Sequence, residues 1–240
     1  MSLMSKKFLY VANWKSYISF SDAVLWCDRF GNQLETLVSK GDIVICPDFL
    51  SIESARKKLP HSVAIGAQDC SGYNKGAFTG GVSAVSLKEV GVRYCIVGHS
   101  ERRQYWGESV KNTAEKARAL CEMNITPIVC VGEGFKKELS SFFDEAGPSV
   151  TSFKSLVVAY EPEGAIGTGV IPSEQSIDSV CKKIHAMLLA NGRASTRVLY
   201  GGSVNSKIVA NLKKVATLDG FLIGRASTDF QELEKIVVLG

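Results

Sequence analysis

The amino-acid sequence predicts a single (β/α)8 barrel, and three features of the pattern support this. Short apolar, β-branched runs recur along the 240 residues at intervals of roughly 30 residues, the length of one βα unit. Each run is followed by a turn and then by a longer stretch with helical periodicity. The runs are continuously apolar, which is typical of strands buried on both faces of a parallel sheet. Eight such units close into a barrel more naturally than they form an open sheet.

The predicted elements cover the chain from end to end. The helical patterns are clearest over residues 21–38, 108–123 and 173–189. In the last of these, Ile177, Cys181 and Ile184 fall on one apolar stripe, and Ser173 with Glu174 marks the beginning of the helix. The predicted strands, each rich in valine, isoleucine, leucine or aromatic residues, comprise residues 8–12, 43–46, 63–67, 94–97, 127–131, 156–159, 198–200 and 220–223.

Composition and charge exclude several classes of protein. With 45% hydrophobic and 22% charged residues, the chain is too apolar to be disordered. Its net charge of +4 suits a small anionic substrate and does not suggest nucleic-acid binding. No apolar run reaches membrane-spanning length, so no membrane partner is expected. The seven cysteines form no CxxC pair, so we expect reduced, mostly buried thiols and a cytoplasmic protein.

No linker, low-complexity segment or change in composition marks a domain boundary. We therefore expect residues 1–240 to form one domain. Met1, Ser2 and Leu3 precede a second methionine, Met4, and we interpret residues 1–3 as a cloning remnant.

The residues that can do chemistry lie directly after predicted strands. In a barrel of this kind the active site forms at the carboxyl ends of the strands, so we expect these side chains to converge. The candidates are Asn13 and Lys15 after the first strand, His99 to Arg103 after the fourth, Glu161 after the sixth, Gly201 to Ser203 after the seventh and Gly224 after the eighth. This clustering carries more weight than any one motif.

Glu161 is a candidate general base. Burial at the apolar mouth of the barrel is expected to raise the pKa of its carboxyl group, which suits proton abstraction near neutral pH. Taken alone, Glu161 is better explained as a strand-end glutamate bonded to nearby amides. The residues that follow, 164–169, are small and have little capacity to pack, so we interpret them as a mobile lid beside the base.

His99 and Lys15 are candidates for stabilising negative charge. His99 lies at the start of a polar helix, whose positive end disfavours the imidazolium, so a neutral ring is expected. The alternative is a capping or packing histidine. Lys15 can neutralise a phosphate or a developing oxyanion, or it is a solvated strand-end lysine. Glycines 201, 202 and 224 together predict a phosphate site, because such barrels bind phosphate at their last two loops.

Seven segments together resemble the triosephosphate isomerase family. They occur in the family's order and span nearly the whole chain. They are residues 13–15 (NWK), 76–80 (GAFTG), 98–103 (GHSERR), 130–133 (CVGE), 160–162 (YEP), 165–169 (AIGTG) and 200–204 (YGGSV).

The resemblance implies a TIM-barrel enzyme that interconverts glyceraldehyde 3-phosphate and dihydroxyacetone phosphate through an enediolate, in glycolysis, gluconeogenesis and the pentose phosphate shunt. It implies no metal and no organic cofactor. Glu161 would be the base, His99 the neutral electrophile and Lys15 the stabilising cation, with Asn13 beside it. Glu101 and Ser100 would be supporting residues, and Glu101 would pair with Lys15.

The same resemblance places the phosphate site and the lid. The phosphate would lie near the amides of Gly167, Ser203, Gly224 and Arg225. The lid would comprise Pro162, Glu163, Gly164, Ala165, Ile166, Gly167, Thr168 and Gly169.

Several positions depart from the family's pattern. Glu163 and Gly164 occupy the lid hinge, where an apolar residue and a tryptophan are usual. Arg225 replaces a second glycine, and its side chain either points away from the phosphate or adds a charge-assisted contact. Gly81 replaces a glutamate of the interface loop, and residues 133–156 look short, which suggests a trimmed fifth helix.

The resemblance further implies a homodimer formed through the loop from Lys75 to Gly81. Phe78 is a bulky apolar residue among glycines there, and a partner chain would cover it. Two other functions stay open on the sequence alone. One is a paralogous isomerase of a four-carbon ketose phosphate, and the other is an inactive barrel that binds a phosphorylated metabolite.

Overall fold

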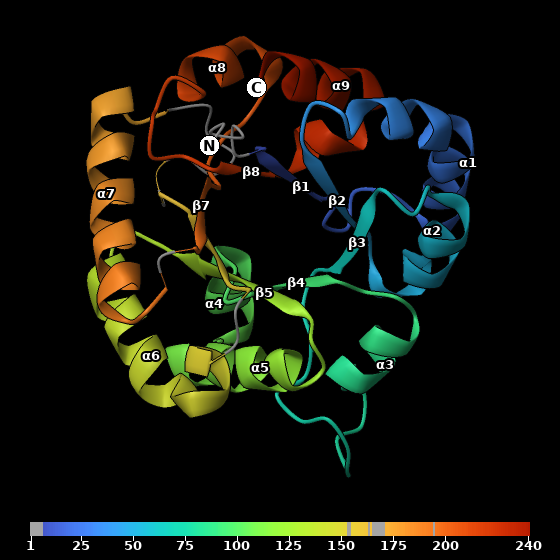
Figure 1. Cartoon of the computed structure of the whole chain (residues 1–240). Coiled ribbons are helices and arrows are strands. Elements are labelled where there is room, and N and C mark those ends of the chain that lie inside the picture. Colours follow the sequence, from blue (N-terminus) through green and yellow to red (C-terminus); the bar gives the residue numbers. More distant parts are fainter. Residues whose placement is uncertain (1–6, 153–154, 163, 165–170, 194) are drawn as a thin grey trace, which may run out of the picture.

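The computed structural model describes residues 7–152, 155–162, 164, 171–193 and 195–240. Its strands form one closed parallel barrel in the order β1-β2-β3-β4-β5-β6-β7-β8, and helices surround the barrel (Figure 1). The predicted (β/α)8 fold is therefore confirmed. Residues 1–3, the suggested remnant, lie outside the described residues.

The strands occur where the apolar runs predicted them, within one residue at each end. The ring closes where Leu9 of β1 pairs with Gly220 of β8. A Cβ atom at Gly220 would lie 2.0 Å from the Leu9 carbonyl oxygen, so only glycine permits this approach. The strands are β1 Leu9–Asn13, β2 Asp42–Cys46, β3 Ala64–Ala67, β4 Tyr94–Val97, β5 Thr126–Val131, β6 Val157–Tyr160, β7 Arg197–Tyr200 and β8 Gly220–Ile223.

The three strongest helical patterns correspond to α1 Phe20–Leu37, α5 Val110–Glu122 and α7 Glu174–Ala190. Ser19, Ser109 and Ser173 cap them by accepting hydrogen bonds from backbone N–H groups of the first turn. The stretch after β5 is helical over the 18 residues of α6, with a break at Gly147. The remaining helices are η1 Phe49–Ser51, α2 Ile52–Lys58, α3 Ala84–Glu89, α4 Ser100–Trp106, α6 Phe135–Ser152, α8 Ser206–Leu212, η3 Arg225–Thr228 and α9 Phe230–Leu239.

Burial on both faces of the strands explains their continuous apolar sequence. Leu9 and Val11 of β1 belong to a small cluster that also takes residues from the other strands. Tyr10 and Ala12, which alternate with them, belong to the large cluster shared with the surrounding helices. Alternate side chains of each strand thus point to opposite faces of the sheet, and both faces are apolar environments.

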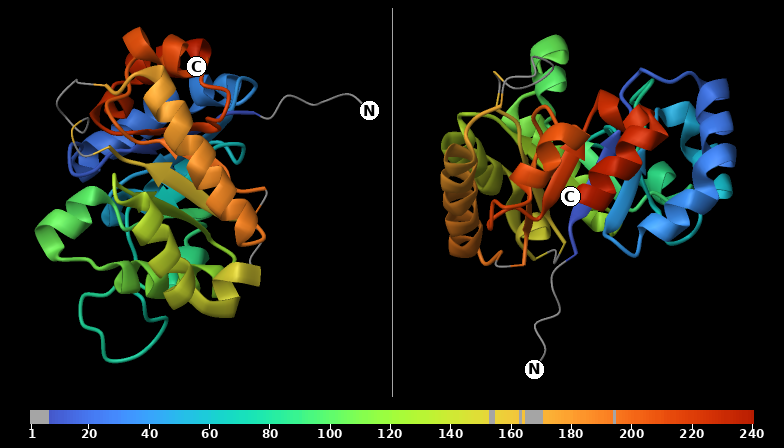
Figure 2. Two further views of the ribbon diagram at one scale, coloured as in Figure 1. Left: turned by 90° about the vertical axis from the view of Figure 1, so that its left-hand side faces the viewer. Right: turned by 90° about the horizontal axis from the view of Figure 1, so that it is seen from above.

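The loop between β3 and α3 projects from the body of the barrel, as Figures 1 and 2 show. It contains residues 75–81, the segment predicted to form an interface. All seven cysteines are free and buried, as expected from the sequence. None of the described helices is long and apolar enough to cross a bilayer.

Candidate active site

A cavity of about 880 Å³ lies among the residues that follow β1, β4, β7 and β8. The barrel brings together side chains that are far apart in the sequence, as the strand ends predicted. Candidate residues that line the cavity are Asn13, Lys15, His99, Ser100, Glu101, Gly201, Gly202, Ser203, Gly224 and Arg225. Of the lid, Pro162 and Gly164 are described, whereas Glu163 and residues 165–169, with the phosphate candidate Gly167, lie outside the described residues.

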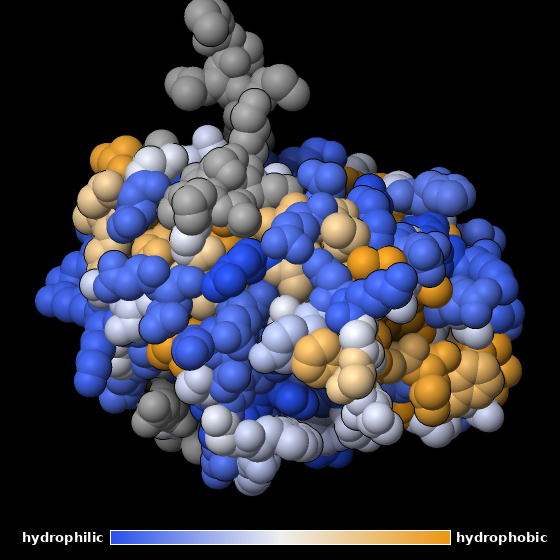
Figure 3. Space-filling model, turned by 90° about the horizontal axis from the view of Figure 1, so that it is seen from below, coloured by the Kyte–Doolittle hydropathy of each residue, from blue (hydrophilic) through white to orange (hydrophobic). Residues whose placement is uncertain are grey.

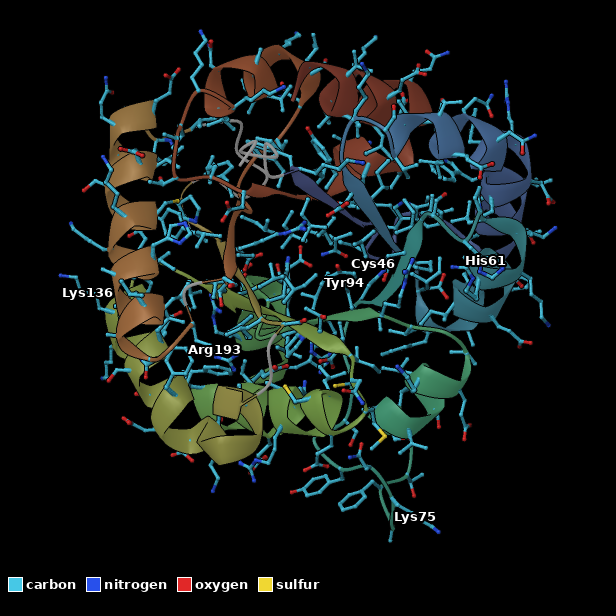
Figure 4. All side chains as sticks on the ribbon, viewed as in Figure 1. Cys46, His61, Lys75, Tyr94, Lys136 and Arg193 are labelled. Atoms are coloured by element: carbon cyan, nitrogen blue, oxygen red, sulfur yellow. The ribbon has the colours of Figure 1, made fainter. Side chains whose placement is uncertain are left out.

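Lys15 has a left-handed backbone, with φ of +50°, which is unfavourable for a residue with a side chain. Its N–H donates to Asn13 Oδ1 at 3.2 Å, and its carbonyl oxygen accepts a hydrogen bond of 2.9 Å from Gln68 Nε2. Gln68 Nε2 also donates to the carbonyl oxygen of Cys46, which Figure 4 labels at the end of β2. Gln68 thus holds the strained turn, a role that the sequence did not predict.

The Lys15 ammonium group lines the cavity and is paired with a carboxylate. Its Nζ is 2.5 Å from Glu101 Oε1, the ion pair that the resemblance implied. Gly224 lies close to the same side chain, because a Cβ atom at Gly224 would be 3.8 Å from Lys15 Nζ. An anion beside the Gly224 backbone would therefore also be near the lysine.

His99 caps the N-terminus of α4. Its Nδ1 accepts a hydrogen bond of 3.2 Å from the N–H of Glu101, whereas Glu101 Oε2 is 3.7 Å away from Nδ1. Because a ring nitrogen that accepts an N–H carries no proton, we assign the proton to Nε2 and a neutral ring to His99. This agrees with the neutral imidazole predicted for a helix N-terminus.

Glu161 is completely buried and does not line the cavity in this conformation. Its Oε2 accepts a hydrogen bond of 2.9 Å from the N–H of Ser100, and its Oε1 lies 3.0 Å from His99 Nε2. To reach a ligand in the cavity, the carboxylate must rotate away from Ser100.

The expectation that burial raises the pKa of Glu161 is wrong for this arrangement. Burial does raise the pKa, but the His99 ring, the Ser100 N–H and the Arg103 guanidinium favour the carboxylate and together hold the pKa below its ordinary value. Glu161 is therefore an ionised carboxylate at neutral pH, which is the form that a general base requires.

Two glycines allow Glu161 and the turn that carries His99 to take these positions. A Cβ atom at Gly201 would lie 3.0 Å from the Cγ of Glu161, so a larger residue would press on the base. Gly98 has φ of +68°, and a Cβ there would lie 2.8 Å from Thr113. The Gly98 N–H donates to Glu108 Oε1 at 3.0 Å, which fixes the turn that carries His99.

A buried charge network supports that turn from behind. Lys116 Nζ lies 2.6 Å from Glu108 Oε2 and 2.7 Å from Asp69 Oδ1. Arg102 contacts both carboxylates, at 3.1 Å and 2.9 Å. The sequence does not predict this network, although Lys116 interrupts the buried face that Thr113, Ala117 and Leu120 form on α5.

Known proteins resemble this chain over nearly its whole length. A family model described as triosephosphate isomerase matches residues 8–239. A triosephosphate isomerase of Thermus thermophilus is 38% identical over 251 residues, covering 98% of each chain. One of Endomicrobium trichonymphae is 37% identical over 246 residues, covering 97% of this chain and 98% of its own.

The chain belongs to the triosephosphate isomerase family. The match extends over nearly the whole sequence.

Proposed function

We propose that the protein interconverts glyceraldehyde 3-phosphate and dihydroxyacetone phosphate, and that Glu161, His99, Lys15 and Asn13 carry the reaction. The observation that carries this proposal is the contact between an ionised, buried Glu161 and a neutral His99, 3.0 Å apart, beside a cavity that contains Lys15. A protein that only bound a phosphorylated metabolite would not need a buried base.

The reaction requires only the transfer of protons. After rotating into the cavity, the Glu161 carboxylate removes a proton from the carbon next to the substrate carbonyl. The electron pair of that C–H bond forms a C=C bond, and the π pair of the carbonyl group moves to its oxygen. His99 Nε2–H donates a hydrogen bond to that oxygen, and the Lys15 ammonium stabilises the enediolate. His99 then gives its Nε2 proton to that oxygen and regains a proton from the neighbouring hydroxyl group, whose oxygen becomes the new carbonyl oxygen. Return of the proton from Glu161 to the former carbonyl carbon completes the isomerisation. Asn13 supports the step by accepting the Lys15 N–H.

The substrate phosphate is assigned to the loops after β7 and β8. Backbone N–H groups near Ser203, Gly224 and Arg225 are the proposed donors, supported by the closeness of Gly224 to Lys15. Gly167 is also proposed as a phosphate-binding residue, and residues 162–169 as the lid, on the grounds of the sequence alone. No step in this scheme calls for a metal ion or an organic cofactor.

A coupled assay tests the proposed substrate. Turnover of glyceraldehyde 3-phosphate should greatly exceed turnover of four-carbon ketose phosphates in the same assay. Faster turnover of a four-carbon substrate would instead favour a paralogous isomerase, and no turnover of either would favour a binding protein. We also propose a cytoplasmic location, which the seven buried free cysteines support.

We propose further that two copies of the chain form a homodimer through residues 75–81. A second cavity of about 240 Å³ shares Asn13, Lys15 and His99 with the first and is also lined by Phe49 and Trp106. Trp106 is 65% exposed. Figure 3 views the side from which the loop projects, and hydrophobic side chains gather at the lower right of that face. Such a surface is typical of an interface.

The loop offers a matching apolar element. Phe78 is 43% exposed and stacks on Tyr73, with ring centres 4.0 Å apart. Figure 4 labels Lys75 at the outer end of this loop. Insertion of the loop beside Lys15 of a second copy would cover both apolar surfaces. Light scattering at micromolar concentration tests this, and a monomer of 26.0 kDa would contradict it.

A further inference from the structure

The charges around the cavity of about 880 Å³ nearly cancel among the described residues. Lys15 pairs with Glu101 at 2.5 Å. Arg103 donates to the carbonyl oxygens of Gly98 and Cys130 and lowers the pKa of Glu161, so its charge offsets that of the buried base. The charges of Lys15, Glu101, Arg103 and Glu161 therefore sum to zero. These four groups supply no net positive charge to a phosphate dianion.

Arg225 is the remaining charged side chain among the described residues that line this cavity. It is exposed, and no carboxylate of the described residues forms an ion pair with it. Its guanidinium carbon lies 5.8 Å from the ring centre of Tyr17, which lines the same cavity and is 55% exposed. The aromatic face therefore holds the guanidinium at the rim of the cavity.

The position of Arg225 in the chain brings its charge to the phosphate loop. Arg225 directly follows Gly224, and a Cβ atom at Gly224 would lie within 3.8 Å of Lys15 Nζ. An anion in the cavity beside Gly224 would thus lie near Lys15, and the Arg225 side chain lines the same cavity. A guanidinium can donate two hydrogen bonds to one phosphate.

We propose that Arg225, whose guanidinium lies over the Tyr17 ring, supplies the net positive charge that binds the phosphate dianion at this site. The inference rests on the proposed function and deepens it, because it assigns the phosphate selectivity to a side chain in addition to backbone N–H groups. It predicts that Arg225 acts on the binding of the phosphate and hardly on the proton transfers, since the phosphate is bonded to neither of the two reacting carbons.

The test compares Arg225→Gln and Arg225→Lys with the wild type. Arg29→Gln is the matched control, because Arg29 is also exposed and also lies over an aromatic ring, Phe30, at 5.1 Å on α1. Calorimetry with inorganic phosphate measures the dissociation constant without any need for turnover. The coupled assay then gives KM and kcat for glyceraldehyde 3-phosphate.

Arg225→Gln should weaken phosphate binding by about tenfold or more, the usual effect of losing a charge-assisted contact. It should raise KM by a similar factor and change kcat by less than about threefold. Arg225→Lys should retain most of the affinity, and Arg29→Gln should behave as wild type. Tyr17→Leu should weaken phosphate binding by a smaller factor than Arg225→Gln.

Phosphate affinity of Arg225→Gln within twofold of wild type would overturn the inference. A loss of kcat equal to the loss of kcat/KM would also overturn it, because the side chain would then act on the chemistry. If the wild type does not isomerise glyceraldehyde 3-phosphate but Arg225→Gln still weakens phosphate binding, the proposed function fails and the assignment of Arg225 stands.

Discussion

Glu161 and Lys15 are the two oppositely charged residues of the candidate active site, and different contacts hold each of them in place. Glu161 is fully buried, and the Ser100 N–H at 2.9 Å favours its ionised form. Lys15 is partly exposed and keeps its ammonium beside Glu101, while Asn13 and Gln68 hold its left-handed backbone. Strain of this kind occurs at functional sites because the surroundings fix the geometry in advance of binding.

Replacement of Lys15 by methionine tests its double role. Lys15→Met removes the charge that faces both the phosphate and the enediolate, so KM should rise and kcat should fall by about 10²–10³. Steady-state kinetics measures both effects. Lys57→Met is a suitable control, because Lys57 is an exposed lysine paired with Glu53 on α2. A change in KM alone would reduce Lys15 to a phosphate anchor.

The lowered pKa of Glu161 predicts how stability depends on pH. Because the folded-state pKa lies below the ordinary value, the carboxylate stabilises the fold above the unfolded-state pKa, and this contribution is lost as pH falls through the folded-state pKa. The free energy of unfolding should therefore decrease more steeply for wild type than for Glu161→Gln between about pH 5 and pH 3. Denaturant titrations at several pH values measure this, and parallel curves would contradict it.

At the level of secondary-structure elements, the turn between β4 and α4 depends on a buried network anchored on α5. Lys116 and Arg102 each pair with both Glu108 and Asp69, and Glu108 accepts the Gly98 N–H. Lys116→Met would leave two buried carboxylates with Arg102 as their cation and should destabilise the fold by about 3–5 kcal/mol. Lys111→Met, an exposed substitution on the same helix, should change stability by less than about 0.5 kcal/mol. Thermal denaturation compares the two variants, and equal stabilities would show that the network contributes little.

The positions of the strands could be predicted from the sequence because each strand is buried on both faces and is therefore continuously apolar. In β1, Leu9 packs in one apolar cluster and Tyr10 in the other. Strand ends also predicted where Lys15, His99 and Glu161 would meet. The pKa of Glu161 could not be predicted in the same way. Its direction depends on the N–H of Ser100, 61 positions away, and burial alone would have given the opposite result. The role of Gln68 likewise depends on contacts with Lys15, after β1, and with Cys46 of β2 that no local pattern encodes.

At the scale of the whole molecule, the projecting loop and the smaller cavity predict an assembly that completes the site. Thr79 is exposed on that loop, and Thr79→Arg would place a charge in the proposed interface. We expect this variant to shift toward monomers and to lose activity, because Lys15 of each copy would lose a neighbouring loop. Thr36→Arg, on the exposed face of α1, is the control for the added charge. Light scattering and the coupled assay on the same samples test this, and a fully active monomer would contradict it.

The most direct test of the account is the turnover of glyceraldehyde 3-phosphate by Glu161→Gln in D₂O, followed by NMR beside the wild type. The amide keeps the shape of the side chain and removes the proton acceptor. Wild type should produce dihydroxyacetone phosphate that carries deuterium from the solvent. Glu161→Gln should bind inorganic phosphate normally while its kcat falls by about 10²–10⁴. Turnover of Glu161→Gln close to that of wild type, with the same deuterium incorporation, would show that Glu161 is not the base.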